Sequence, residues 1–336
     1  MNYASVSRRW PVWISAALCF ATASDSAPAP NASDLPGMQA TPFWLFPLNP
    51  PSAGEKVIHP ATPLHLPSSR LEFTEAQLSD LFSAPDWHPE THSSMPHIVQ
   101  HGRAPGTYAC GYCHLPGGEG RPENAALAGL PAAYIVQQVA DIKSGARRSA
   151  WHGSPFRPVD LMRDVAANAE AADVVAAAEY FAAQTLRPRV TVIERKRIPR
   201  LRVMGWVYVI DPRGGQEALG QRLLEWAPDF TRHERRDAEM RYVAFVPPGS
   251  VNRGREIATT VRRGLTQPCT GCHGEHLQGM GLVPPLAGRS PTYLLRQLMA
   301  FKTGDRAGVA GAPMQAVAAE LQIPDMIAVA AYAAAQ

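Results

Sequence analysis

Two copies of one short motif constrain this chain of 336 residues more than any other feature. Residues 110–114 read C-G-Y-C-H and residues 269–273 read C-T-G-C-H, so both have the form C-x-x-C-H. Four of the five cysteines lie in these motifs. In an exported chain four cysteines allow two disulfides, and a C-x-x-C pair alone is also a thiol redox motif. Two C-x-x-C units also combine into zinc sites in other proteins.

The histidine that follows each pair favours a different chemistry, because C-x-x-C-H is the attachment signature of c-type haem. Two intervening residues let both sulfurs reach the vinyl groups on one edge of the porphyrin, and the next residue then lies beneath the iron. Haem is preferred to zinc because each pair has its own histidine and the copies lie far apart in the sequence. We therefore predict two covalently bound haem c groups, attached and ligated by Cys110, Cys113 and His114, and by Cys269, Cys272 and His273.

Each motif belongs to a longer internal repeat. At a constant spacing of 159 residues the L-A-G triplet at 127–129 coincides with that at 286–288. The same spacing relates Tyr134 to Tyr293, Gln138 to Gln297, Lys143 to Lys302, Gly145 to Gly304, and Arg147 to Arg306. Further on, the spacing falls to 152 because the first copy has a longer loop at about 149–158. The repeat predicts two similar domains.

Each repeat offers one methionine as a further iron ligand. Met162 and Met314 each lie 18 residues before a tyrosine, so they occupy equivalent positions. A methionine thioether raises the haem potential and closes the iron, whereas an open position permits oxygen or peroxide chemistry. Buried methionines are more often core fillers than ligands, but the shared position favours ligation here. We predict Met162 and Met314 as axial ligands, in loops that precede the last helix of each repeat.

Apolar residues at helical spacing predict several helices in the two repeats. Those of the first repeat cover 132–145 and 171–184, and the first of these ends at a glycine. Those of the second repeat cover 253–260, 292–304 and 325–335. A short helix over 74–82 is also expected, with Thr74 and Gln77 as a capping box.

With these motifs, both repeats resemble class I cytochromes c, and their combination resembles the tandem dihaem class I cytochromes c of bacterial periplasms. The resemblance rests on C-G-Y-C-H, L-A-G-L-P-A-A-Y-I-V-Q-Q and K-S-G-A-R in the first copy, and on C-T-G-C-H-G, L-A-G-R-S-P-T-Y-L-L-R-Q and K-T-G-D-R in the second. It implies a small helical fold around each haem, His/Met ligation and electron transfer. It also implies that a proline carbonyl orients the proximal histidine. Pro284 occupies that position in the second copy, whereas Ala125 stands there in the first.

The resemblance covers 96–187 and 249–336 and leaves three other parts. Residues 1–23 read as a signal peptide, with Arg8 and Arg9 before a short apolar run that contains Cys19, and with cleavage near Ala23. An uncleaved anchor is the alternative, but the run is shorter than the roughly 20 residues that span a bilayer. We therefore expect the mature chain in the periplasm.

Residues 24–95 form a proline-rich N-terminal extension, and residues 188–248 read as a small α/β insert. β-branched and aromatic residues predict strands within 189–198, 201–210 and 240–246, and 216–226 reads as a helix. The expected fold class is thus mainly α, with two class I cytochrome c domains joined by this insert.

Two further groups of residues have a functional and a structural interpretation. Four histidines lie before the first motif: His88, His92, His97 and His101. If one of them replaced Met162 as a ligand, the first haem would be bis-histidine. We expect instead that all four are surface residues of a loop. The insert has a basic run that either docks an acidic partner or is a solvated face, as charge runs usually are: Arg195, Lys196, Arg197, Arg200 and Arg202.

The formal net charge is only +3, which does not indicate a nucleic-acid partner. We predict an electron carrier that accepts electrons from a dehydrogenase or a membrane complex and passes them to an oxidase or another cytochrome. Two alternatives are a peroxidase-like enzyme with one open haem, and the cytochrome subunit of a dehydrogenase complex.

Overall fold

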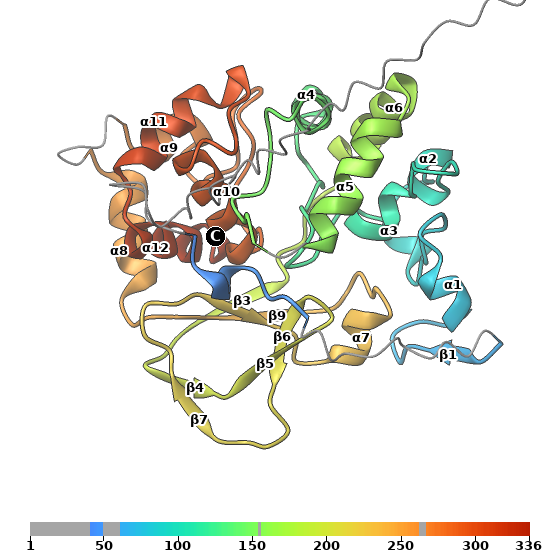
Figure 1. The fold of residues 1–336 in the computed structure, drawn as a ribbon, viewed down its shortest axis with the longest axis horizontal. Helices are drawn as coiled ribbons and strands as arrows, with labels where there is room; N and C mark the ends of the chain where they lie inside the picture. The colour runs from blue at the N-terminus through green and yellow to red at the C-terminus, as the bar shows by residue number, and fades with distance from the viewer. Residues whose placement is uncertain (1–40, 50–60, 154–155, 262–266) are drawn as a thin grey trace, which may run out of the picture. The chain divides into compact units, whose positions relative to one another are not determined.

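A computed structural model describes residues 41–49, 61–153, 156–261 and 267–336. The predicted signal peptide, with Cys19 and the cleavage position near Ala23, lies outside the described residues, as do 24–40 and 50–60 of the predicted extension. Residues Thr41–Gln336 form one compact unit, drawn in Figure 1. The division of the chain into five segments therefore stays a prediction. Among the described residues, no helix has the length and apolar character to cross a membrane.

Helices dominate both repeats. The first repeat contains α2 (His97–Gln100), α3 (Cys110–His114), α4 (Ala132–Ser144), α5 (Arg157–Asn168) and α6 (Ala171–Ala182). The second contains α8 (Ser250–Thr259), α9 (Thr270–His273), α10 (Pro291–Lys302), the 3-10 turn η4 (Val309–Gly311), α11 (Ala312–Glu320) and α12 (Ile323–Ala334). The five helices predicted in the repeats are all present, with ends shifted by a few residues. α4 ends as predicted, at Gly145 with a left-handed φ of 78°.

The expectation that the two methionines lie in loops is wrong. Met162 lies within α5 and Met314 lies within α11. Each of these helices has a proline in its first turn, Pro158 and Pro313. Proline fits there because the first backbone N–H groups of a helix have no intrahelical acceptor. The prolines therefore start these helices instead of breaking them.

Between the repeats the chain forms a mixed five-stranded sheet in the order β3-β9-β8-β6-β5. Its strands are β3 (Val190–Glu194), β5 (Leu201–Met204), β6 (Val207–Ile210), β8 (Leu224–Trp226) and β9 (Tyr242–Val246), and α7 (Phe230–Glu234) precedes β9. Parallel pairs join β3 to β9 and β6 to β8, and antiparallel pairs join β8 to β9 and β5 to β6. A separate antiparallel pair consists of β4 (Arg197–Pro199) and β7 (Gln216–Ala218).

The helix predicted over 216–226 is wrong. This segment forms β7 and β8, separated by Gly220 at a left-handed φ of 62°. β8 lies between β6 and β9 and bonds to both. These long-range ladders supply the backbone partners that a helix would otherwise supply, so tertiary pairing overrides local propensity.

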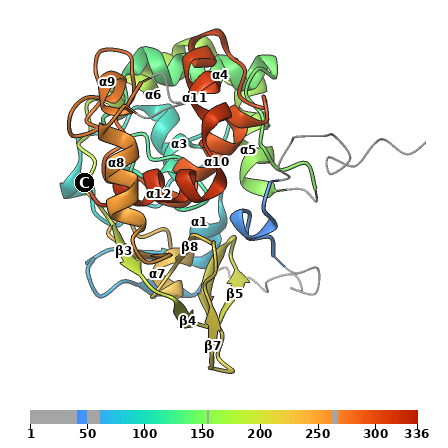
Figure 2. The same cartoon turned by 90° about the vertical axis from the view of Figure 1, so that its left-hand side faces the viewer.

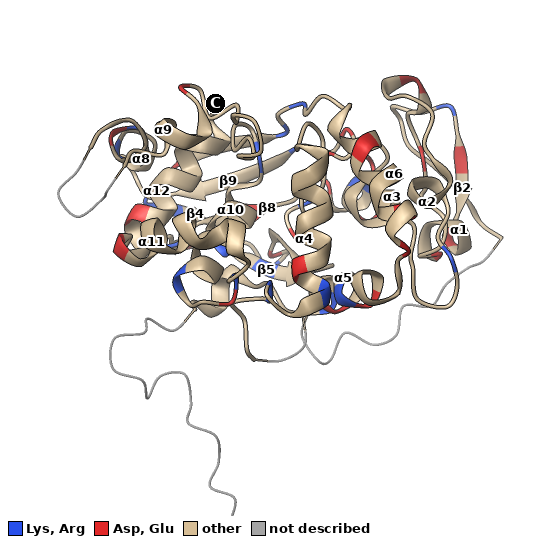
Figure 3. Ribbon diagram, turned by 90° about the horizontal axis from the view of Figure 1, so that it is seen from above, with Lys and Arg blue, Asp and Glu red and all other residues tan. Residues whose placement is uncertain are grey.

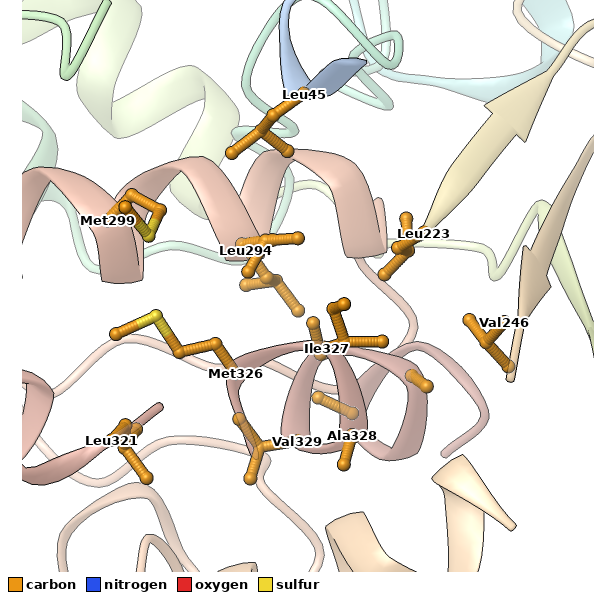
Figure 4. Packing of buried hydrophobic residues seen from close by; sticks show 14 of the residues in the cluster. Leu45, Leu223, Val246, Leu294, Met299, Leu321, Met326, Ile327, Ala328 and Val329 are labelled. Atoms are coloured by element: carbon orange, nitrogen blue, oxygen red, sulfur yellow. The ribbon is translucent and has the colours of Figure 1, made fainter. Parts of the chain in front are cut away.

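The largest apolar core joins the second repeat to the sheet and to the N-terminal extension. α12 packs on α8, as Figure 2 shows. It also lies against β3 and β9. Figure 4 shows Met326 and Ile327 of α12 facing Leu294 of α10, with Leu45 of the 3-10 turn η2 (Phe43–Leu45) beyond α10. Leu223 and Val246 close this core from the sheet.

The longer loop of the first repeat also enters this core. Phe46 of the extension stacks on Trp151, with ring centroids 5.6 Å apart, and meets Phe156 edge-on at 5.5 Å. Phe156 in turn contacts Trp206 of the insert. The additional residues of the first copy thus connect it to the extension and the insert.

The rest of the extension packs beside the first repeat. It comprises β1 (Pro63–His65), β2 (Glu72–Thr74), α1 (Glu75–Ser79) and the 3-10 turn η3 (Pro89–Thr91). The predicted capping box is confirmed: Gln77 N donates to Thr74 Oγ1 and Thr74 N donates to Gln77 Oε1. The helix over 74–82 is shorter than predicted, ending at Ser79.

The two repeats meet through a reciprocal set of hydrogen bonds. Arg147 donates to Tyr293 Oη at 2.7 Å and to Gln297 Oε1 at 3.0 Å. Arg306 donates to Tyr134 Oη at 2.6 Å and to Gln138 Oε1 at 2.7 Å. An antiparallel backbone bridge pairs the two arginines. Each repeat therefore offers the same residues to the other, as in a two-fold symmetric dimer interface.

The contact between α8 and α12 predicts a strong effect at Gly254. A Cβ atom there would lie 2.0 Å from the carbonyl oxygen of Ala328, so the helix backbones must move apart. We expect Gly254→Ala to lower the free energy of unfolding by about 2–3 kcal/mol, the cost of overpacking. Urea unfolding followed by circular dichroism measures it. Asn252→Ala, at an exposed position of the same helix, should stay within about 0.5 kcal/mol of the wild type; equal effects would contradict the close packing.

The reciprocal interface predicts energetic coupling between the repeats. In a double-mutant cycle of Arg306→Ala and Tyr134→Phe, we expect a coupling of about 1 kcal/mol, because the two side chains bond directly. The control cycle combines Tyr134→Phe with Arg255→Ala, which lies exposed on α8, and should be additive. Additivity in both cycles would show that the repeats do not depend on this contact.

Candidate functional site

The two motif histidines occupy the same local structure. α3 carries Cys110, Cys113 and His114, while α9 carries Cys272 and His273. The Nδ1 of His114 lies 2.8 Å from the carbonyl oxygen of Ala125, and the Nδ1 of His273 lies 2.8 Å from that of Pro284. A carbonyl only accepts, so Nδ1 carries the proton in both rings. The unprotonated Nε2 is then the atom available to a metal.

The loops that supply these carbonyls make equivalent backbone hydrogen bonds in the two repeats. Gly120 N donates to the carbonyl of His114, and Gly279 N to that of His273. Further along, Gly129 N bonds the carbonyl of Phe181 in α6, and Gly288 N bonds that of Ala333 in α12. These two glycines share a φ of 68°. The internal repeat of the sequence is therefore also a repeat of the backbone around each motif.

All eight predicted site residues line one cavity of about 1310 Å³. They are Cys110, Cys113, His114, Met162, Cys269, Cys272, His273 and Met314. The lining is chiefly apolar, and Phe181 contacts the His114 ring edge-on with centroids 6.4 Å apart. Within the described chain the four cysteines are free thiols, and no group of three His, Cys, Asp or Glu side chains converges to hold a metal ion.

Burial sets the protonation of these groups. It lowers the pKa of His114 and of His273, so both rings are neutral, as a metal ligand must be. Burial raises the pKa of Cys110 to about 12 and also raises the pKa of Cys113 and of Cys269. Neutral imidazoles and apolar walls fit a large apolar ring tethered through sulfur.

The four histidines before the first motif have other partners. His88 is buried, contrary to the expected surface position, and its Nε2 lies 2.9 Å from Asp237 Oδ1. The His92 ring is also largely buried and contacts Asp86 and the hydroxyl of Tyr180. His97 and His101 are exposed, and their rings lie tilted against each other with centroids 5.4 Å apart. None of the four lines the cavity, so none of them is placed to replace Met162.

Sequence reasoning assigned no role to the polar residues that line the middle of the cavity. They are the reciprocal interface residues Tyr134, Gln138, Arg147, Tyr293, Gln297 and Arg306. These residues recur at the 159-residue spacing that aligns the repeats, and this recurrence is the sequence signal that could have identified them. The positive charges of Arg306 and Arg147 lower the pKa of Tyr134, against the opposing effect of burial.

Sequence comparison finds c-type cytochromes among the proteins similar to this chain. The chain is 40% identical over 74 residues to cytochrome c-554(547) of Halothiobacillus neapolitanus, and the match covers 20% of this chain and 81% of that protein. Over 229 residues it is 26% identical to cytochrome c4 of Azotobacter vinelandii, covering 66% of this chain and 82% of that protein. Over 238 residues it is 28% identical to the thiosulfate dehydrogenase electron acceptor of Thiomonas intermedia (strain K12), covering 69% and 80%. No protein-family model matches the chain.

Two solved structures superpose on part of the chain. Cytochrome c4 from Pseudomonas stutzeri superposes with a TM-score of 0.42 at 22% identity, over 67% of this chain and 92% of that one. Thiosulfate dehydrogenase (TsdBA) from Marichromatium purpuratum superposes with a TM-score of 0.46 at 26% identity, over 69% of this chain but only 37% of that one.

Three observations point to the same family. The two C-x-x-C-H motifs have matching backbones, both motifs line one cavity, and the similar proteins include cytochromes. The chain belongs to the dihaem class I cytochromes c, and it is an electron-transfer protein.

Proposed function

We propose that this chain is a periplasmic carrier that holds two haem c groups, each between a histidine and a methionine. The observation that supports it is that His114, Met162, His273 and Met314 line one cavity together with the four motif cysteines. In both histidines Nδ1 donates to an equivalent backbone carbonyl, which leaves Nε2 available to bind a metal. The repeat thus supplies the same ligand set twice.

In this proposal haem supplies one-electron chemistry between ferrous and ferric iron, and the chain does the rest. The cysteines tether the ring, and the carbonyls of Ala125 and Pro284 fix the imidazole orientation and make it a stronger donor. The thioethers of Met162 and Met314 keep oxygen and peroxide from the iron. The apolar walls exclude water and favour the less charged ferrous state.

Removing either methionine tests the ligation and separates a carrier from a peroxidase-like enzyme. We expect Met162→Ala and Met314→Ala each to open one haem, because alanine cannot coordinate iron. Each variant should lose about half of the weak far-red absorption of iron–methionine bonding and bind carbon monoxide at one haem. Leu161→Ala, next to Met162 in α5, is the control and should bind none. Ready carbon monoxide binding and peroxide turnover by the wild type would reject the carrier and favour the enzyme.

The periplasmic assignment rests on the sequence pattern of residues 1–23 and on the site chemistry. The thiols of Cys110 and Cys113 are half-buried, and burial raises the pKa of each, which favours the protonated form. A protonated thiol is a poor nucleophile, so we expect haem attachment before the chain folds. That order fits a chain exported unfolded.

For the partner, we infer a dehydrogenase that donates electrons. The name of one relative, a thiosulfate dehydrogenase electron acceptor, supplies this class. The basic run of the insert gives it a docking surface: Arg195, Lys196, Arg197, Arg200 and Arg202 are all exposed, on and around β4 and β5 (Figure 3). Within the described chain, no salt bridge neutralises any of the five. A permanent complex with the dehydrogenase would appear as a subunit that co-purifies with the native protein in size exclusion.

Reduction by a purified thiosulfate dehydrogenase with thiosulfate tests this partner. We expect reduction of the haems in stopped flow, at a rate that falls with ionic strength. The double variant Arg200→Glu/Arg202→Glu should slow it about tenfold at low salt, because charge complementarity speeds association. Arg255→Glu, at an exposed position of α8, is the control for a change of net charge. No reduction would reject this partner class, and a rate insensitive to salt and to the double variant would reject the docking surface.

A further inference from the structure

The two motifs have different surroundings although their own backbones match. Tyr112 of the first motif is buried, whereas Gly271, its counterpart in the second, is exposed. Cys113 is half-buried and its counterpart Cys272 is exposed. The extension and the insert cover the first motif: Tyr112 Oη donates to the carbonyl of Leu78 at 3.2 Å, and Arg236 lies over the Tyr112 ring.

Arg236 is the most direct of these contacts. Its guanidinium lies 3.5 Å from the centroid of the Tyr112 ring, and its Nη1 donates to the Tyr112 carbonyl at 2.9 Å. Its Nε is buried and has no partner. Among the described residues no carboxylate forms a salt bridge with it. The backbone of Arg236 is left-handed, with a φ of 58°, which is unfavourable for a side chain of this kind. The chain thus places a guanidinium that has no carboxylate partner among the described residues against the first motif.

More guanidinium groups from outside the first repeat reach the loop after its motif. Arg189 of the insert donates to the carbonyl of Gly120. From the second repeat, Arg296 donates to the carbonyl of Pro122 at 2.9 Å, and Arg289 donates to the carbonyls of Ala126 and Ala128 at 2.6 and 2.8 Å. In the described structure, no arginine of the first repeat or the insert donates to the matching loop of the second repeat. Arg289 also donates to the carbonyl of Pro285 in that second loop at 2.7 Å, so it is shared by the two sites, whereas Arg236, Arg189 and Arg296 reach only the first.

Buried acids only partly balance this charge. Arg121 and Glu123 form a salt bridge at 3.0 Å and cancel each other. Burial raises the pKa of Glu119 and of Glu225, which moves both toward their neutral forms. Burial also lowers the pKa of Arg236, and it lowers that of Arg296 to about 10, at which a guanidinium is still charged at neutral pH. Arg236 is the cation in direct contact with the motif, through both the ring and the backbone carbonyl of Tyr112. The surroundings of the first motif thus carry net positive charge at low dielectric, where it acts strongly.

We infer that the haem at the first motif has the higher reduction potential of the two, and that Arg236 is a positioning and tuning residue for it. This inference rests on the proposed function. Positive charge near a redox group stabilises the reduced form, which carries one positive charge fewer. One electron then passes from the reduced second site to the oxidised first site, and no bond or proton is exchanged. The second motif, whose Cys272 is exposed, meets external partners, and the first motif, which the extension and the insert cover at Tyr112, retains the electron.

Spectroelectrochemical titration of the dihaem protein tests the inference, with Met314→Ala used to identify the wave of the second haem. We expect the first haem to titrate at the higher potential. Arg236→Gln retains a donor for the Tyr112 carbonyl and removes the charge. It should shift the electron equilibrium between the haems at least tenfold toward the second, about 59 mV for one electron. Arg236→Lys retains the charge and should stay near the wild type.

Arg195→Gln, which removes an exposed cation screened by water and salt, is the matched control and should leave both potentials unchanged. An equal shift of both haems, an unmoved first haem in Arg236→Gln, or a lower potential at the first haem would each overturn the inference. A pyridine haemochrome spectrum separates this failure from that of the proposed function. Two haem c groups with unmoved potentials reject only the tuning role, whereas their absence rejects the proposed function and the inference with it.

Discussion

The site depends on one hydrogen bond made twice, from the Nδ1 of a motif histidine to a backbone carbonyl. In the first repeat Ala125 supplies that carbonyl and in the second Pro284 does, at the same distance of 2.8 Å. The backbone carbonyl at this position therefore accepts the hydrogen bond from the histidine whether the side chain is that of alanine or of proline. The loop is held by the bond from Gly129 or Gly288 to the last helix of its repeat, so the orientation of each imidazole follows from the packing of α6 or α12. Helix packing, loop conformation and ligand geometry are thus one connected constraint.

Duplication explains how one cavity collects two such sites. Because the repeats have equal backbones, a contact from Arg147 to Tyr293 has its mirror in the contact from Arg306 to Tyr134. A self-complementary surface within one chain needs no second evolved partner surface. The same residues line the cavity, so the interface that joins the repeats also forms part of the walls of both sites.

The sequence predicted what local chemistry dictates and missed what distant contacts decide. The motifs, the repeat and the main helices could be read because their signals lie within one turn or one period. The capping box of Thr74 and Gln77 is of the same kind. β8 could not be read, because it is a strand only through β6 and β9. Arg236 could not be found either, since 124 residues separate it from Tyr112. The placement of Met162 and Met314 in loops failed for a different reason, because proline both breaks and begins helices.

The extension and the insert matter because they break the symmetry of the duplication. Two equal sites would have equal potentials and equal exposure, and an electron would have no preferred position. Here Tyr112 lies under Arg236 and its counterpart Gly271 is exposed. Burial and net charge act together at the first site: low dielectric strengthens the field of a cation that solvent would screen at the second. A chain that carries the same motif twice can therefore give its two sites different roles without altering a ligand, by changing only what covers them.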